Sequence, residues 1–307
     1  MRKEHAALAI IRVSRRLFSH TRVHSWPVTG YLYRKVFGLV APGGDRTSDY
    51  LGVTLTYPTE DSAIAAGLVG GYYERQELTL YSRLAGVSKT VLDAGGNIGI
   101  YACIGAAQLP PGGRLVTFEP VPQNLAYVRR NLDQNGLTDR VEVVQTALGP
   151  QPGTVVIHLA AGGFTGSHSV ARATVGADSS GSLTVPMATI DDYVSEHGLS
   201  PVDLIKVDVE GFDIAVLRGA LRTLRTDQPT LLVEYAPALL RNAGYDPVDL
   251  LEIIFSSYEH VLLIDEPRNV VRAVERVELA AMADRKNLVN LVAINRSDHL
   301  ALCQEPL

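Results

Sequence analysis

The sequence predicts an α/β protein with a mostly parallel, Rossmann-like sheet, and three observations lead to this fold class. From about residue 88 onward, short β-branched segments alternate with segments of helical periodicity, as in parallel strands joined by helices. The first of these strands leads directly into a glycine-rich turn. With 46% hydrophobic residues, the 307-residue chain has ample apolar side chains for one large core.

Seven core strands are expected. The helix after the first strand carries small residues on one face, which permits close packing on the sheet. The helix after the second strand has Leu125, Val128 and Leu132 on one face and is followed by Gly136, a favoured C-cap. The expected strands span residues 90–94, 114–118, 141–146, 204–209, 230–234, 261–264 and 288–294.

Two segments depart from this alternation. Residues 150–186 are rich in Gly, Ser, Thr and Ala around two β-like runs, 154–159 and 182–185, which predicts an inserted hairpin or lid. Residues 1–70 are expected to form a helical N-terminal accessory or cap segment, and residues 71–300 the main domain.

Charge is unevenly distributed along the chain. Residues 1–40 contain eight Lys and Arg residues against one acid, Glu4, with apolar residues at helical spacing. We expect a basic amphipathic helix followed by a second apolar segment at 31–40, which would serve as a cap or as a homodimer contact. Association with a membrane surface is the alternative.

Composition argues against several classes of protein. A formal net charge of −5 and a pI near 5.9 argue against nucleic acid as a partner. Cys103 and Cys303 lie far apart without metal-ligand spacing, so neither a disulfide framework nor a zinc site is expected. No apolar run reaches transmembrane length and no secretory core is present, which predicts a cytoplasmic location.

The glycine-rich turn predicts a nucleoside site. Gly95, Gly96 and Gly99 follow an apolar strand and precede a helix, so backbone can approach a ligand closely and free amides face it. Glu119 comes twenty residues after Gly99, just past the second strand, where a carboxylate can accept hydrogen bonds from ribose hydroxyls. Asn97 is interpreted either as a ligand-facing group or as a local cap.

The turn favours S-adenosylmethionine (SAM) over NAD. A dinucleotide site prefers the spacing Gly-x-Gly-x-x-Gly after an apolar strand end, and Asp93 would repel a pyrophosphate. The same carboxylate suits a ligand that carries an ammonium group and a sulfonium. An NAD-dependent oxidoreductase remains the alternative, and a tight structural turn without a ligand is a third reading.

A second acidic segment follows the strand at 204–209. Ligands bind beyond the carboxyl ends of the strands in such sheets, so Asp208 and Glu210 are expected at the same rim as the turn. Either could orient or deprotonate an acceptor, or hold a divalent cation; capping the next helix is the alternative. Lys206 would need a carboxylate partner if buried. His168, within the predicted lid, is a further candidate base.

These motifs together resemble the FkbM family of SAM-dependent methyltransferases over roughly residues 71–295. The resemblance rests on segments 91–99, Phe118-Glu119-Pro120, Asn124-Leu125, Ala147-Leu148-Gly149, 189–193 and 205–211, and more weakly on Gly71-Tyr72-Tyr73-Glu74. Gly96 stands where the family usually carries alanine.

The resemblance implies a class I methyltransferase fold, with seven strands of which the last is antiparallel, and residues 71–300 as the methyltransferase domain. It implies O-methylation of a sugar, macrolide or other secondary metabolite; nitrogen or carboxylate methylation, or a non-catalytic subunit, are alternatives. Magnesium at Asp208 is an option. The residues expected to bind SAM are Glu74, Asp93, Gly95, Gly96, Asn97, Gly99, Glu119, Pro120, Asn124, Ala147, Leu148 and Asp208.

Overall fold

The structure is a computed structural model that describes residues 43–160, 166, 168–175, 179–283 and 288–306. The predicted N-terminal amphipathic helix, its apolar companion and the dimer contact assigned to them therefore lie outside the described residues, and they stay predictions.

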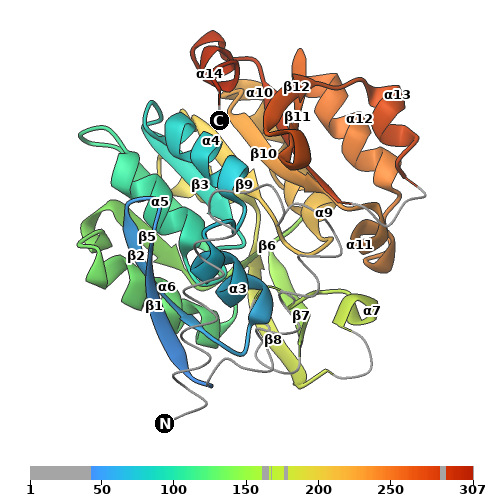
Figure 1. Ribbon diagram of the computed structural model, residues 1–307. Helices are drawn as coiled ribbons and strands as arrows, with labels where there is room; N and C mark the ends of the chain where they lie inside the picture. Colours follow the sequence, from blue (N-terminus) through green and yellow to red (C-terminus); the bar gives the residue numbers. More distant parts are fainter. Residues whose placement is uncertain (1–42, 161–165, 167, 176–178, 284–287, 307) are drawn as a thin grey trace.

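A central eight-stranded sheet organises the fold (Figure 1). Its order is β12-β11-β13-β10-β9-β3-β4-β5, and β5, β4, β3, β9 and β10 are parallel. β13 lies antiparallel between β10 and β11. The strands are β3 (Thr90–Ala94), β4 (Arg114–Phe118), β5 (Val141–Val144), β9 (Leu204–Val207), β10 (Thr230–Tyr235), β11 (His260–Asp265), β12 (Val270–Ala273) and β13 (Val289–Ile294).

All seven predicted strands are present, and the last is antiparallel as the family resemblance implies. The count of seven is wrong by one, because β12 adds an edge strand. It pairs with β11 through a tight turn in which Asn269 has a left-handed backbone, φ 56°. Only four residues long and partly exposed, β12 lacks the alternating apolar pattern that identifies a half-buried strand.

Helices cover both faces of the sheet because successive strand residues point to opposite sides. Val91 packs in one core with residues of α4, α5, α6 and α14, and its neighbour Leu92 packs in the other with α8 to α13. The helices are α4 (Arg75–Ala85), α5 (Ile100–Gln108), α6 (Pro122–Gln134), α8 (Ile190–Glu196), α9 (Asp213–Arg218), α10 (Leu221–Thr226), α11 (Pro237–Asn242), α12 (Pro247–Ser257), α13 (Arg276–Ala280) and α14 (Ser297–Cys303).

The described part of the N-terminal segment is not only helical, which corrects the prediction for residues 1–70. β1 (Asp45–Tyr50) and β2 (Val53–Pro58) form an antiparallel hairpin, followed by α3 (Ser62–Gly70). Asn131 of α6 exchanges hydrogen bonds with the backbone of Thr56, and its Nδ2 also donates to the carbonyl of Ile98 at 2.8 Å. These amide contacts attach the hairpin to the domain.

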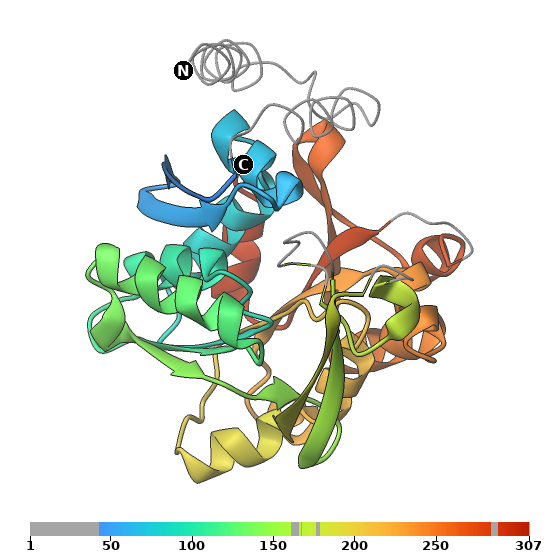
Figure 2. The same ribbon diagram turned by 90° about the horizontal axis from the view of Figure 1, so that it is seen from below.

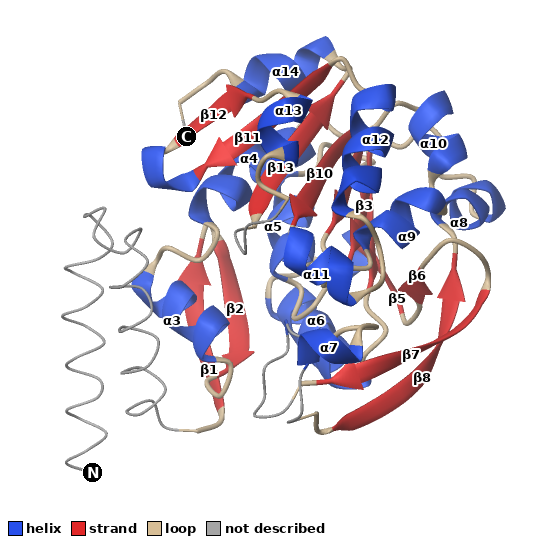
Figure 3. Ribbon diagram, turned by 90° about the vertical axis from the view of Figure 1, so that its right-hand side faces the viewer, coloured by secondary structure: helices blue, strands red, loops and turns tan. Residues whose placement is uncertain are grey.

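The predicted inserted hairpin is present. β7 (Gly153–Leu159) and β8 (Gly181–Ala188) pair antiparallel, and β8 also pairs with β6 (Ala147–Leu148). The short helix α7 (Arg172–Val175) lies between them in sequence. Figure 3 shows hairpin β1–β2 and ribbon β7–β8 at the same end of the molecule, and Figure 2, seen from that end, shows them apart from each other.

Candidate active site

The turn between β3 and α5 is held tightly against its neighbours. Gly95 has φ 87°, and a Cβ there would lie 2.0 Å from the carbonyl oxygen of Asp208. A Cβ at Gly96 would lie 2.2 Å from Oγ1 of Thr117. Glycine is therefore required at 95 on both conformational and steric grounds, and position 96 accepts a side chain only if Thr117 moves.

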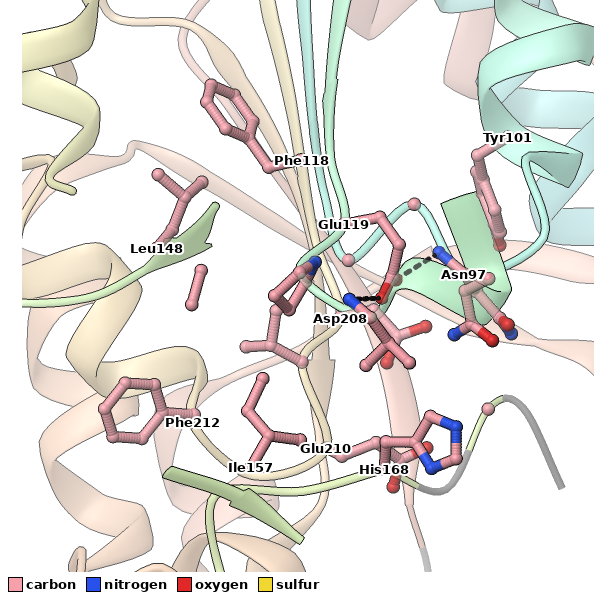
Figure 4. Close-up of a pocket in the computed structure, with 18 of the residues that line it drawn as sticks. Asn97, Tyr101, Phe118, Glu119, Leu148, Ile157, His168, Asp208, Glu210 and Phe212 are labelled. Atoms are coloured by element: carbon pink, nitrogen blue, oxygen red, sulfur yellow. Dashed lines mark hydrogen bonds between the residues drawn. The ribbon is translucent and has the colours of Figure 1, made fainter. Parts of the chain in front are cut away.

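A cavity opens at the carboxyl ends of β3, β4 and β9, with about 890 Å³ of empty space including its mouth. Figure 4 shows Phe118, Leu148 and Phe212 on one side of the cavity and Asn97 and Tyr101 on the other. The cavity thus has an apolar end and a polar end.

Glu119 lies between these ends with a fixed carboxylate. Its Oε2 accepts from the amide of Asn97 and its Oε1 from the amide of Val121, each at 2.8 Å. Burial raises the pKa of Glu119 to about 7, against the opposing effect of these amides. Two backbone donors leave further lone pairs for a ligand.

Asp93 does not line the cavity. It is fully buried, and its Oδ2 accepts from Oγ1 of Thr117 at 2.8 Å. Its Oδ1 lies 3.7 Å from Nζ of Lys206. The three residues stand at paired positions of β4, β3 and β9. The sequence predicts that Asp93 meets a cationic ligand directly; in the structure its charge instead faces Lys206.

Lys206 has the carboxylate partners that its burial requires, as predicted. Its Nζ lies 3.4 Å from Oδ2 of Asp208 and donates to the carbonyl of Gly95 at 3.1 Å. The ammonium also lies 4.6 Å from the centre of the Tyr101 ring. Burial lowers the pKa of Lys206, but Asp208 and Asp93 outweigh that effect and the pKa is raised. Lys206 is thus a charged side chain at the cavity floor.

Glu210 lies in the same turn after β9, with a left-handed backbone at φ 53°. Oγ of Ser169, from the segment between β7 and β8, donates to its carbonyl at 2.9 Å. Burial and the neighbouring Asp208 raise the pKa of Glu210 to about 9. Its side chain lines the cavity beside His168 (Figure 4).

His168 presents a donor to the cavity. Its Nδ1 accepts from the backbone amide of Ala160 at 3.0 Å, so a neutral ring carries its proton on Nε2. Burial lowers the pKa of His168 below its ordinary value. In this arrangement His168 can orient an acceptor, but it is not set up as the base that the sequence suggests.

The FkbM methyltransferase domain model matches residues 93–261 of this chain, which is more than half of its length. The chain belongs to the FkbM methyltransferase family. The predicted class, a SAM-dependent methyltransferase, is confirmed by this match.

Two named relatives and one solved structure show the range of similarity. The 2-O-methyltransferase NoeI of Sinorhizobium fredii is 30% identical over 176 residues, which cover 53% of this chain and 69% of NoeI. The hexuronic acid methyltransferase AglP of Haloferax volcanii is 26% identical over 162 residues, which cover 53% of this chain and 59% of AglP. A crystal structure of methyltransferase FkbM from Methylobacillus flagellatus KT has 18% identity and a TM-score of 0.42, over 90% of this chain and 62% of that one.

This FkbM methyltransferase brings most of the predicted residues to one cavity. The predicted residues on its wall are Gly95, Gly96, Asn97, Glu119, Pro120, Asn124, Ala147, Leu148, His168, Asp208 and Glu210. Gly99 lies outside the wall, where an added Cβ would lie 3.1 Å from Cα of Val128 in α6. Glu74 lies behind the wall, where its Oε2 accepts from Oη of Tyr101 at 2.9 Å. Burial, followed by Asp208, raises the pKa of Glu74 to about 7.

Several wall residues were not predicted. The sequence predicts Tyr101 only as a residue that packs its helix on the sheet. In the structure its hydroxyl bonds to Glu74 and its ring lies beside the ammonium of Lys206. Tyr73 directly precedes the predicted Glu74, and Phe212 lies two residues after the predicted Glu210. Ile157 arrives from ribbon β7–β8, and no local pattern announces such a long-range approach.

Metal and membrane features can be stated for the described residues only. Among them, no group of three or more His, Cys, Asp or Glu side chains is arranged to hold a metal ion. Across the same part of the chain, no helix combines the length and apolar character needed to span a bilayer.

Proposed function

We propose that this FkbM methyltransferase transfers the methyl group of SAM to a hydroxyl of a sugar-like or other small-molecule acceptor. The main support for this proposal is a single cavity that has an apolar end, a fixed carboxylate at Glu119 and an acidic end at Asp208 and Glu210. We also propose residues 71–300 as the catalytic domain, with residues 43–70 packed on it.

The cavity matches the three chemical parts of SAM. Phe118, Leu148 and Phe212 offer an apolar slot for adenine, and Glu119 offers acceptors for the ribose hydroxyls. Oδ1 of Asn97 is buried without a hydrogen-bond partner, which supports the ligand-facing reading of this side chain over the cap. When bound, SAM supplies an electrophilic methyl group on a positively charged sulfur.

The acidic end supports the acceptor role. An alcohol must lose its proton as the new O–CH3 bond forms, and Asp208 is a carboxylate at the cavity wall that can accept it, with Glu210 on the same wall. Nε2–H of His168 can hold the acceptor oxygen in line. Holding donor and acceptor in one cavity is worth roughly 7–11 kcal/mol at best in such bimolecular steps.

The charges of the wall favour an uncharged acceptor. Lys206 is the only Lys or Arg among the described wall residues, and Asp93 and Asp208 already face it. A carboxylate on the acceptor would meet Glu210 and Asp208 without a free cation. We therefore propose a neutral hydroxylated acceptor for this chain, although one relative is named for hexuronic acid.

Methyl-labelled SAM tests the function. Incubation with a panel of neutral glycosides, their uronate counterparts and hydroxylated macrolides should label a neutral member, and the product should survive mild base as an ether does. A base-labile product would identify carboxylate methylation, and an amine product nitrogen methylation. Parallel assays with EDTA and with added Mg²⁺ test the metal option at Asp208.

A further inference from the structure

Glu210 has an exceptional charge environment within the cavity. Its carboxylate makes no hydrogen bond and no salt bridge with any other described residue, although it lies largely buried at the cavity wall. The charged or titratable groups that surround it are Asp208, Asp213, Glu74 and Glu234, which are acidic, Lys206, which is basic, and the neutral His168.

The single cation in this group forms its ion pairs with Asp208 and Asp93, and it only partly stabilises the carboxylate of Glu210. Nζ of Lys206 lies 3.4 Å from Asp208 and 3.7 Å from Asp93, and it donates to the Gly95 carbonyl at 3.1 Å. The space around Glu210 therefore holds more acidic groups than basic ones, and no cation pairs with Glu210 itself among the described residues. Burial first, and then the neighbouring Asp208, raises the pKa of Glu210 to about 9. A positive charge bound beside Glu210 would favour its ionised form.

The backbone keeps the side chain at this place. Glu210 has φ 53° and Gly211 follows with φ 91°, where a Cβ would lie 2.5 Å from the carbonyl oxygen of Leu239. Oγ of Ser169, from the segment between β7 and β8, donates to the carbonyl of Glu210. A strained residue that is held from two sides is typical of a functional position.

We propose that Glu210 is the counter-ion for the positively charged sulfur of the methyl donor, so that the cavity selects SAM over its product S-adenosylhomocysteine (SAH). The proposal rests on the proposed function, because it needs SAM in this cavity. During transfer the S–CH3 bond breaks, the O–CH3 bond forms and the acceptor hydroxyl gives its proton to the carboxylate of Asp208. The sulfur thereby becomes a neutral thioether, and the attraction to Glu210 disappears.

Binding calorimetry tests this selection without an acceptor. The ligands are SAM, SAH and sinefungin, in which a protonated amine replaces the methyl-sulfonium group. The wild-type protein should bind SAM and sinefungin at least about fivefold more tightly than SAH, as expected for a charge pair near 4 Å even when it is screened as strongly as in bulk water. In Glu210→Gln this preference should fall to within about twofold, while the affinity for SAH stays the same.

Glu119→Gln is the matched control within the same cavity. Because Glu119 is assigned to the ribose, which all three ligands share, this variant should weaken all of them by one factor and keep the ratio. Thermal unfolding of each variant, together with its affinity for SAH, shows whether it is folded.

Three results overturn the proposal. One is a wild-type protein that binds SAH as tightly as SAM. Another is a Glu210→Gln variant that keeps the wild-type ratio, which would place the carboxylate at the ammonium group that SAM and SAH share. The third is a protein that binds no adenosyl ligand. That result would contradict the proposed function itself as well as the counter-ion role of Glu210.

Discussion

Nζ of Lys206 lies 3.7 Å from Oδ1 of Asp93, and the two buried side chains stand at paired positions of adjacent parallel strands. Thr117, the residue paired with Asp93 on its other side, donates to the second oxygen of the same carboxylate. The floor of the cavity is thus a polar row across three central strands. Such a row is stable only while each member keeps its partner.

Lys206→Met should destabilise the fold by about 3–5 kcal/mol, because it leaves the buried carboxylate of Asp93 without its cation. Urea unfolding measures the effect. The double variant Lys206→Met with Asp93→Asn should recover part of the loss, and Lys89→Met, at an exposed lysine, should change little. A single variant as stable as wild type would show that the pair contributes nothing.

Gly96→Ala should cost about 1–3 kcal/mol, since its Cβ would lie 2.2 Å from Oγ1 of Thr117. Relieving that clash requires Thr117 to give up its bond to Asp93. Chemical denaturation of a double-mutant cycle with Thr117→Ala checks this origin. Gly96→Ala should lower the free energy of unfolding less in the Thr117→Ala background than in the wild type. Equal losses in both backgrounds would exclude the clash.

Glu119 should make stability depend on pH. Its pKa is raised from 4.5 to about 7, so the folded state binds this proton more tightly than the unfolded state. The contribution is complete below about pH 4.5 and is lost as the pH rises through 7. Relative to Glu119→Gln, the wild-type free energy of unfolding should fall by about 3 kcal/mol across that window. Ligand-free unfolding at a series of pH values measures the difference, and parallel curves would contradict it.

Asp208→Asn should retain SAM binding and lower turnover by about 10²–10⁴-fold, as expected for a group that assists proton removal. Calorimetry and a methyl-transfer assay on the same preparation separate the two effects. Glu196→Gln, at an exposed position of α8, is the control and should behave as wild type. Unchanged turnover in Asp208→Asn would remove this residue from the proton pathway.

The sequence was most informative where structure is local. Continuous β-branched runs identify the seven main strands, because strands buried on both faces carry this pattern. The hairpin β1–β2 escaped prediction, since it depends on contacts of Thr54 and Thr56 with Asn135 and Asn131, about eighty positions away. The residues of segment 45–58 themselves give no sign of these distant contacts.

The sequence predicts which residues line the cavity better than it predicts what each of them does. A strand end and a glycine turn locate the cavity, and Glu119, Asp208 and Glu210 meet there as expected. The role of Asp93 depends on which side chain the neighbouring strand places beside it. That partner is Lys206, more than one hundred residues later, and strand order is needed to pair the two.

The left-handed residues at and directly behind the cavity wall have a consequence for engineering. Glu74, Asn97 and Glu210 are three of the six non-glycine residues with positive φ in the described part of the chain, and each costs on the order of 1–2 kcal/mol there. Glycine at these positions would relieve the strain and remove the side chain together. Selection for thermal stability alone should therefore favour substitutions at these positions and yield proteins that are more stable but inactive. A screen for stable variants must measure catalysis at the same time.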